Sequence, residues 1–132
     1  MSQLIKKHEG LRLKPYKCTA GKLTIGYGRN IEDNGISQTE AEEMLNNDIQ
    51  RCYSECIKFK FWDKLNEARQ AVIIDMCFNL GITRLKSFKK MLAALQAGNY
   101  PKAAAELLDS NYARQVKSRA QENAQILIKG VF

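Results

Sequence analysis

The sequence predicts an α+β protein: a small N-terminal lobe with a β-hairpin, a long connecting helix and an all-helical C-terminal lobe. Residues 11–27 alternate apolar with polar side chains around a turn that contains glycine, as hairpin strands do. From residue 37 onward, apolar residues instead recur every three or four positions, which is typical of helices. We therefore expect a single domain with lobes at residues 1–36 and 57–132, joined by a helix over residues 37–56.

The first lobe begins with a short amphipathic helix, predicted over Ser2–Glu9, and Gly10 is a natural stop for it. The hairpin strands Leu11–Tyr16 and Lys22–Tyr27 follow, and Lys17–Gly21 provides the turn between them. This order places the end of the first helix beside the hairpin.

Helices account for the rest of the chain. Ser37 and Glu40 fit a capping box at the start of the connecting helix. A second helix over residues 66–80 is apolar almost all round, which favours the centre of a core. Further helices are predicted over residues 87–96, with Ser87 as its cap, 102–109, after Pro101, and 118–129.

Composition limits the class of protein. With 45% hydrophobic and 27% charged residues, the 132-residue chain is typical of a globular protein and not of a disordered one. Its net charge of +7 favours a polyanionic partner such as nucleic acid, a membrane surface or a bacterial cell wall. No nucleic-acid-binding motif accompanies the charge, so we expect no nucleic-acid partner. We expect a monomer.

Cysteine usage and the N-terminus indicate the compartment. No stretch is apolar enough for a signal peptide or a membrane span, so we expect a cytoplasmic chain without stable membrane insertion. Its four cysteines are then expected to be reduced thiols. One histidine and no Cys-x-x-Cys pair are poor material for a zinc site, so no metal is expected.

Glu9 is the first candidate for chemistry. A carboxylate at a helix C-terminus is electrostatically disfavoured, because the helix dipole is negative there. A carboxyl group that holds its proton more readily suits general acid catalysis. A solvated surface glutamate is the alternative interpretation of this residue alone.

The segment from Glu9 to Gly28 resembles the active-site segment of the phage-type lysozymes, glycoside hydrolase family 24, the endolysins of the T-even and lambdoid phages. That family has a glutamate, eight residues, an aspartate, five residues and a threonine, and Glu9 and Thr24 stand at the outer two places. Cys18 occupies the place of the aspartate, which is a departure from the pattern. The resemblance implies a lysozyme-like fold.

Two further segments resemble the same family and imply substrate contacts. In residues 75–81, Phe78 and Asn79 stand where the family's side chains face the cleft. The apolar helix around Phe78 also predicts that this ring packs in the core. We expect Asn30 to contact substrate as well.

The second of these segments is residues 110–119. Tyr112 and Arg119 occupy its aromatic and arginine positions, near the catalytic glutamate in the family. Tyr112 could equally be a core residue. Arg119 is expected to pair with Glu9, and the alternative is a solvated side chain on the last helix.

The resemblance implies hydrolysis of the β-1,4 bond between N-acetylmuramic acid and N-acetylglucosamine in bacterial peptidoglycan. Glu9 would protonate the leaving oxygen, while Cys18 and Thr24 would position water on the opposite face of the sugar. A gap wide enough for a water favours inversion at the anomeric carbon. No cofactor is required. An endolysin made in the host cytoplasm would reach the wall through a holin.

Three alternatives remain open. A lytic transglycosylase needs one catalytic acid and no water-activating carboxylate, so the cysteine at position 18 favours it. An inactive peptidoglycan-binding module is the second alternative. A basic nucleic-acid-binding protein is the weakest of the three.

Overall fold

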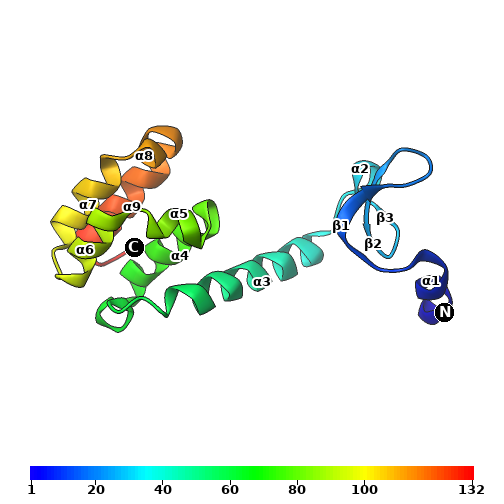
Figure 1. Cartoon of the computed structure of the whole chain (residues 1–132), viewed down its shortest axis with the longest axis horizontal. Helices are drawn as coiled ribbons and strands as arrows, with labels where there is room; N and C mark the ends of the chain where they lie inside the picture. Colours follow the sequence, from blue (N-terminus) through cyan, green and yellow to red (C-terminus); the bar gives the residue numbers. More distant parts are fainter. The chain divides into compact units, whose positions relative to one another are not determined.

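The computed structural model describes all residues from Met1 to Phe132. One three-stranded antiparallel sheet lies near the N-terminus and every other regular element is helical (Figure 1), which confirms the α+β, lysozyme-like class. The chain divides into two compact units, Met1–Met44 and Leu45–Phe132. That both units belong to one domain stays a prediction.

The N-terminal unit contains the predicted helix and hairpin. Helix α1 (Ser2–Glu9) ends at Gly10, and β1 (Arg12–Lys17) pairs with β2 (Leu23–Gly26). A third strand, β3 (Arg29–Asn30), extends the sheet in the order β1-β2-β3. Strand β3 and the single-turn helix α2 (Ile31–Asn34) were not predicted, because neither is long enough to show a periodic pattern.

Polar contacts hold this unit together, since Thr24 is the one buried residue among Met1–Met44. Arg29 binds the carboxylate of Glu40 through both guanidinium nitrogens, at 2.9 and 2.8 Å, which ties β3 to the start of α3 (Gln38–Cys56). The capping box is confirmed. The Ser37 amide donates to Glu40 Oε1 at 2.8 Å, and the Glu40 amide donates to Ser37 Oγ at 3.1 Å.

The C-terminal unit is all-helical, as predicted. The helices expected over residues 66–80 and 118–129 match the structure to within one residue. Ser87 is not a helix cap as predicted, because its hydroxyl donates to the carbonyl of Arg84 and closes the preceding helix, which was not predicted. After α3, the elements are η1 (Trp62–Lys64), α4 (Glu67–Leu80), α5 (Ile82–Lys86), α6 (Lys89–Gln96), α7 (Tyr100–Leu108), α8 (Asn111–Val116) and α9 (Ser118–Lys129).

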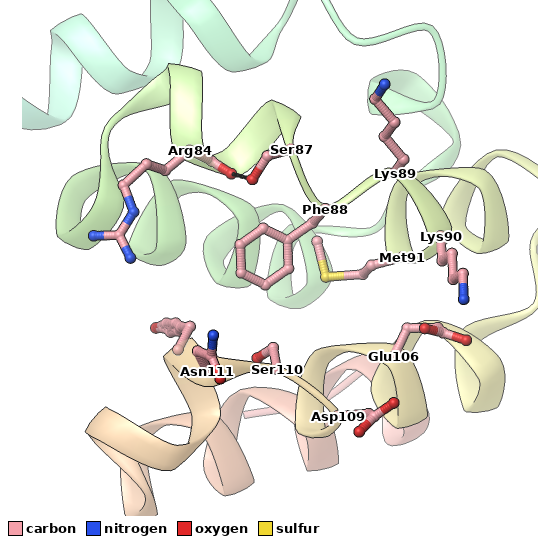
Figure 2. Close-up of a pocket in the computed structure, with 11 residues that line it drawn as sticks. Arg84, Ser87, Phe88, Lys89, Lys90, Met91, Glu106, Asp109, Ser110 and Asn111 are labelled. Carbon is pink, nitrogen blue, oxygen red and sulfur yellow. Dashed lines mark hydrogen bonds between the residues drawn. The ribbon is translucent and has the colours of Figure 1, made fainter.

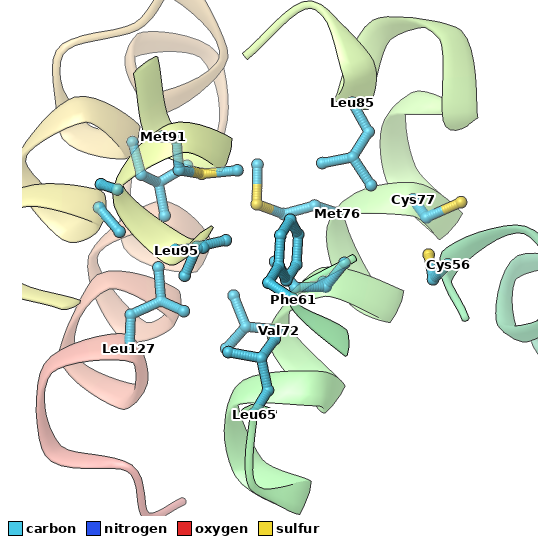
Figure 3. Close-up of a cluster of buried hydrophobic side chains, with 14 of the residues drawn as sticks. Cys56, Phe61, Leu65, Val72, Met76, Cys77, Leu85, Met91, Leu95 and Leu127 are labelled. Carbon is cyan, nitrogen blue, oxygen red and sulfur yellow. The ribbon is translucent and has the colours of Figure 1, made fainter. Parts of the chain in front are cut away.

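The core of this unit forms around α4 (Figure 3). Val72 and Met76 of α4 face Leu95 of α6 and Leu127 of α9, and all four side chains are almost completely buried. Burying each such side chain contributes about 1.5–3 kcal/mol. The expectation of a central, largely apolar helix is therefore confirmed. No helix of the chain combines the length and the apolar character needed to span a bilayer.

Candidate active site

Glu9 lies against the turn that follows β2. A Cβ built on Gly28 would fall 2.5 Å from Glu9 Oε2 and 3.0 Å from Glu9 Cδ, closer than any side chain permits. Gly28 also has a φ of +77°, which L-residues rarely adopt. Both facts favour glycine at this position: another residue would strain the backbone and would displace the Glu9 carboxyl group from its present place.

A second contact attaches α1 to the same turn. Lys6 Nζ lies 5.4 Å from the centroid of the Tyr27 ring, within the range of a cation–π interaction. Lys6 is in the last turn of α1 and Tyr27 precedes Gly28. These two contacts fix the C-terminal end of α1, and with it Glu9, on the loop after β2.

Cys18 lies in the hairpin turn, directly after β1. Its amide donates to the carbonyl of Lys22 at 2.9 Å, and the amide of Gly21 donates back to its carbonyl at 2.8 Å, which closes the turn. Hydrogen bonds from the backbone amides of Lys22 and Ala20, with a smaller one from the Thr24 hydroxyl, hold the pKa of the Cys18 thiol below its usual value. The turn therefore makes the Cys18 thiol easier to deprotonate than an ordinary thiol.

Thr24 is buried at the centre of the sheet, with 3% of its surface exposed. Its hydroxyl donates to the carbonyl of Lys22 at 2.9 Å, which leaves the oxygen lone pairs free to accept. Thr24 pairs with Tyr16 of β1 and Asn30 of β3, and cross-strand partners lie on one face of a sheet. The structure thus brings Cys18, Thr24 and Asn30 together around the start of β2.

The amide of Asn30 has a structural task. Its Oδ1 accepts from the backbone of Asp33 and its Nδ2 donates to Asp33 Oδ2, both at 3.0 Å, so that Asn30 caps α2. Capping was not predicted, because a helix of four residues gives no sequence signal. A substrate contact from Asn30 would come in addition to this role.

Arg119 does not have the partner expected from the sequence. Its Nε and Nη2 bind the two carboxylate oxygens of Asp75 at 2.9 and 2.7 Å. Asn123 donates to the same carboxylate at 2.9 Å. Burial alone would raise the pKa of Asp75, but the bonds from Arg119 and Asn123 outweigh it and hold the pKa below its usual value. The pairing with Glu9 is therefore replaced by a bidentate ion pair between α9 and α4. Sequence reasoning missed Asp75, although it begins the segment that contains Phe78.

A groove in the C-terminal unit collects two of the predicted substrate residues. Phe78 and Asp75 of α4 and Arg119 of α9 all line it, and its volume is about 460 Å³. Phe78 is 44% exposed, so the prediction that its ring packs in the core is wrong. The ring lies near the C-terminal end of α4, where the helix leaves the core. The wall is mostly apolar and includes Leu45, Ile49, Tyr53, Trp62, Ala71 and Ile74.

Asn79 and Tyr112 do not line this groove. Asn79 is exposed at the end of α4. Tyr112 is 2% exposed, so its ring is a core residue, and its hydroxyl is buried without a hydrogen-bond partner. Its ring meets that of Phe88 edge to face, with centroids 6.0 Å apart.

A second hollow, also of about 460 Å³, lies between α6 and the α7–α8 segment (Figure 2). Phe88 and Met91 form the apolar part of its lining. Lys90 comes from one side of the hollow, while Glu106 and Asp109 come from the facing segment. The hollow therefore presents both signs of charge around an apolar floor. No group of three or more potential metal ligands occurs in the chain.

Comparisons with known proteins extend over nearly the whole chain. Residues 6–125 match the family model described as phage lysozyme. The chain is 37% identical over 109 residues to an endolysin of Acyrthosiphon pisum secondary endosymbiont phage 1, an alignment covering 80% of this chain and 73% of the relative. It is 36% identical over 136 residues to an endolysin of Bacillus phage B103, covering 94% and 51%.

A third relative is the pre-baseplate central spike protein Gp5 of Enterobacteria phage T4, 30% identical over 159 residues, where the alignment covers 98% of this chain and 28% of the relative. The chain thus spans about half or less of the length of two of these three relatives.

Proposed function

This chain belongs to the phage lysozyme family and is a glycoside hydrolase, and from that premise we propose that it hydrolyses the β-1,4 bond between N-acetylmuramic acid and N-acetylglucosamine in bacterial peptidoglycan. The observation that carries the proposal is the hairpin turn, where the backbone amides of Lys22 and Ala20 lower the pKa of the Cys18 thiol. Glycoside hydrolysis uses a general acid and an anionic group on either side of the scissile bond, and Glu9 and Cys18 are the proposed pair.

Glu9 is the proposed general acid. Its carboxyl proton passes to the glycosidic oxygen as the bond to the anomeric carbon breaks. The contact with Gly28 supports this role, because glycine has no side chain beside the carboxyl group and so leaves room for a sugar oxygen. The contact between Lys6 and Tyr27 keeps the end of α1 in place during this step.

Cys18 and Thr24 are proposed to supply the water. The hydroxyl oxygen of Thr24 accepts a hydrogen bond from the water, and the Cys18 thiolate takes its proton as the oxygen attacks the anomeric carbon. Attack from the face opposite the leaving group inverts that carbon. Solvent then removes the proton from Cys18 and restores the proton on Glu9, so the cycle needs no cofactor.

Substrate binding is proposed for the exposed residues Phe78 and Asn79, for the half-buried Asn30 and for the groove that Phe78 shares with Arg119. A ring that is 44% exposed offers an apolar face to a sugar ring or an N-acetyl methyl group. Tyr112 would act indirectly, because it is buried. We propose that Tyr112 supports the wall of the second hollow.

The second hollow fits the peptide part of peptidoglycan. Stem peptides carry both amino and carboxylate groups on an aliphatic chain. Arg84 and Lys90 would attract the carboxylates and Glu106 and Asp109 the amine, above the apolar Phe88. The net charge of +7 would add a long-range attraction to the anionic wall.

Release from the host cytoplasm through a holin, action as a monomer and the absence of nucleic-acid binding remain part of the proposal. Lytic transglycosylase activity is the second candidate, and the thiol at position 18 favours it over a two-carboxylate mechanism. A catalytically inactive peptidoglycan-binding module is the third.

The test is clearance of purified peptidoglycan by the parent protein, Glu9→Gln and Cys18→Ser under reducing conditions, with mass spectrometry of the products. We expect muropeptides with reducing-end muramic acid from the parent and a loss of activity of about 100-fold or more with Glu9→Gln. A 1,6-anhydro product would identify a transglycosylase. Binding to the wall without released muropeptides would identify an inactive module.

A further inference from the structure

Three of the four cysteines gather where α3 meets α4. Cys52 and Cys56 are the only buried residues of α3, with 6% and 0% of their surfaces exposed. Cys77 of α4 is 4% exposed, and its side chain lies beside that of Cys56 (Figure 3). The fully buried side chains of this end of α3 are therefore thiols, which none of the proposed catalytic steps uses.

The three thiols interact with one another. Burial, followed by the hydrogen bond and charge interaction with Cys77, raises the pKa of Cys52 to about 11. Burial and Cys77 also raise the pKa of Cys56 well above its usual value. Cys77 is thus the common neighbour of both α3 thiols. Cys52 and Cys77 also line the same hollow, and only cysteines that lie close together can be bridged by a disulfide.

Cys52 and Cys77 differ from Cys56 in how easily a small reagent can reach them. A hollow of about 220 Å³ opens beside these two residues and is also lined by Asp48, Arg51, Glu55, Phe78, Gly81 and Ile82. Cys56 does not line it and has no exposed surface. A small reagent can approach Cys52 and Cys77 through this hollow, whereas Cys56 is shielded behind them.

We propose that Cys52 and Cys77 are a dithiol that forms an interhelical disulfide when the folded protein meets a small-molecule disulfide of the glutathione type. One of the two thiols loses its proton and attacks one sulfur of the reagent, which forms a mixed disulfide with the protein, while the S–S bond of the reagent breaks and its other sulfur leaves as a thiolate. The second thiol loses its proton and attacks the protein sulfur of that mixed disulfide, expelling the other thiolate. The two cysteines are oxidised, the reagent is reduced to two thiols, and the two protons end on those thiols.

Two properties follow for the disulfide. The attacking species is a thiolate, and burial raises the pKa of Cys52 to about 11, so attack by Cys52 speeds up as the pH rises from about 7 to about 9. The bond joins α3 to α4 and closes the chain between them into a loop. This constrains the unfolded state, so we expect the melting temperature of the oxidised protein to rise by about 5 °C or more.

The test incubates the full-length Cys18→Ser protein with oxidised glutathione, without denaturant, and counts free thiols by alkylation and mass spectrometry. Cys18→Ser removes the partly exposed thiol that would otherwise pair between molecules. We expect two of the three remaining thiols to disappear without intermolecular products, and peptide mapping to join residues 52 and 77. The matched variants are Cys56→Ala and Cys77→Ala in the same background.

Cys56→Ala should still form the cross-link and gain thermal stability on oxidation, while Cys77→Ala should do neither. Circular dichroism confirms that each variant is folded before oxidation. Three unreacted thiols in the folded protein after prolonged treatment would overturn the proposal. So would a bond between residues 56 and 77 in place of the expected pair.

Discussion

The carboxyl group of Glu9 rests on the backbone of Gly28, so closely that a Cβ there would fall 2.5 Å from Glu9 Oε2. This contact joins the last residue of α1 to the loop after β2, although 18 residues separate the two in the sequence. Glycine at position 28 is therefore part of how the proposed acid is positioned. Gly28 ends the segment that resembles the lysozyme family, but the physical reason for a glycine at this position comes from the fold.

Gly28→Ala should lower the lytic rate on the order of 100-fold, because the added methyl displaces the Glu9 carboxyl group from its working position. The positive φ also costs about 1–2 kcal/mol of stability. Gly26→Ala is the matched control, since Gly26 has a φ of +71° but nothing within 4 Å of an added Cβ. It should lose similar stability and keep most of the activity. Equal lytic rates for the two variants would contradict a role for Gly28 in positioning Glu9.

Cys18 should be the first thiol to react with iodoacetamide in the native protein. The turn lowers its pKa and leaves it partly exposed, whereas burial raises the pKa of Cys52. Time-resolved alkylation with peptide mapping measures the order of modification. Alkylation at position 18 should abolish clearance of peptidoglycan in parallel. Full activity of the singly alkylated protein would exclude Cys18 from the reaction.

Cys18→Asp should clear peptidoglycan at least as fast as the parent. A carboxylate is fully charged at neutral pH and could accept hydrogen bonds from the same amides of Ala20 and Lys22. Cys18→Ala, which offers no base, should lower the rate by about 100-fold. An unchanged rate in Cys18→Ala, with 1,6-anhydro products, would instead favour the transglycosylase.

Asp75→Asn should destabilise the C-terminal unit by about 1–2 kcal/mol at neutral pH, because it leaves Arg119 without its bidentate partner in a half-exposed site. The pKa of Asp75 is depressed in the folded state, so this contribution is complete above the unfolded pKa of about 4. It is lost as the pH falls through the lower, folded pKa. Urea unfolding of both proteins across this pH range measures the difference, and Arg114→Ala is an exposed control. A difference in the free energy of unfolding that persists to the lowest pH would contradict stabilisation by the ion pair.

Arg84→Ala combined with Lys90→Ala should slow lysis of intact peptidoglycan by about two- to fivefold, since an exposed charge pair contributes about 1 kcal/mol or less. Glycan strands stripped of their peptides should be cut at the parental rate, because the second hollow would then have no ligand. Lys60→Ala removes an exposed charge outside the hollow. An equal loss on both substrates would indicate a general charge effect in place of peptide binding.

Local signals in the sequence account for many of the elements. The capping box at Ser37 and Glu40, the glycines after α1 and α4, and the period change at residue 37 depend on interactions within a few residues. Such interactions are the same in any fold, so they can be predicted from neighbouring residues. The short elements β3, α2, α5 and α8 were missed, because helices and strands of two to six residues carry too little periodicity.

The sequence by itself determined the α+β class, the family motif at Glu9, Cys18 and Thr24, and a basic charge suited to an anionic wall. Only the tertiary structure decided the partners of particular side chains. It paired Arg119 with Asp75 across 44 residues, buried Tyr112 and left Phe78 exposed. A sequence motif or the period of the apolar residues describes one segment at a time. Which charges meet, and which face of a helix remains in solvent, depends on contacts between segments far apart in the chain.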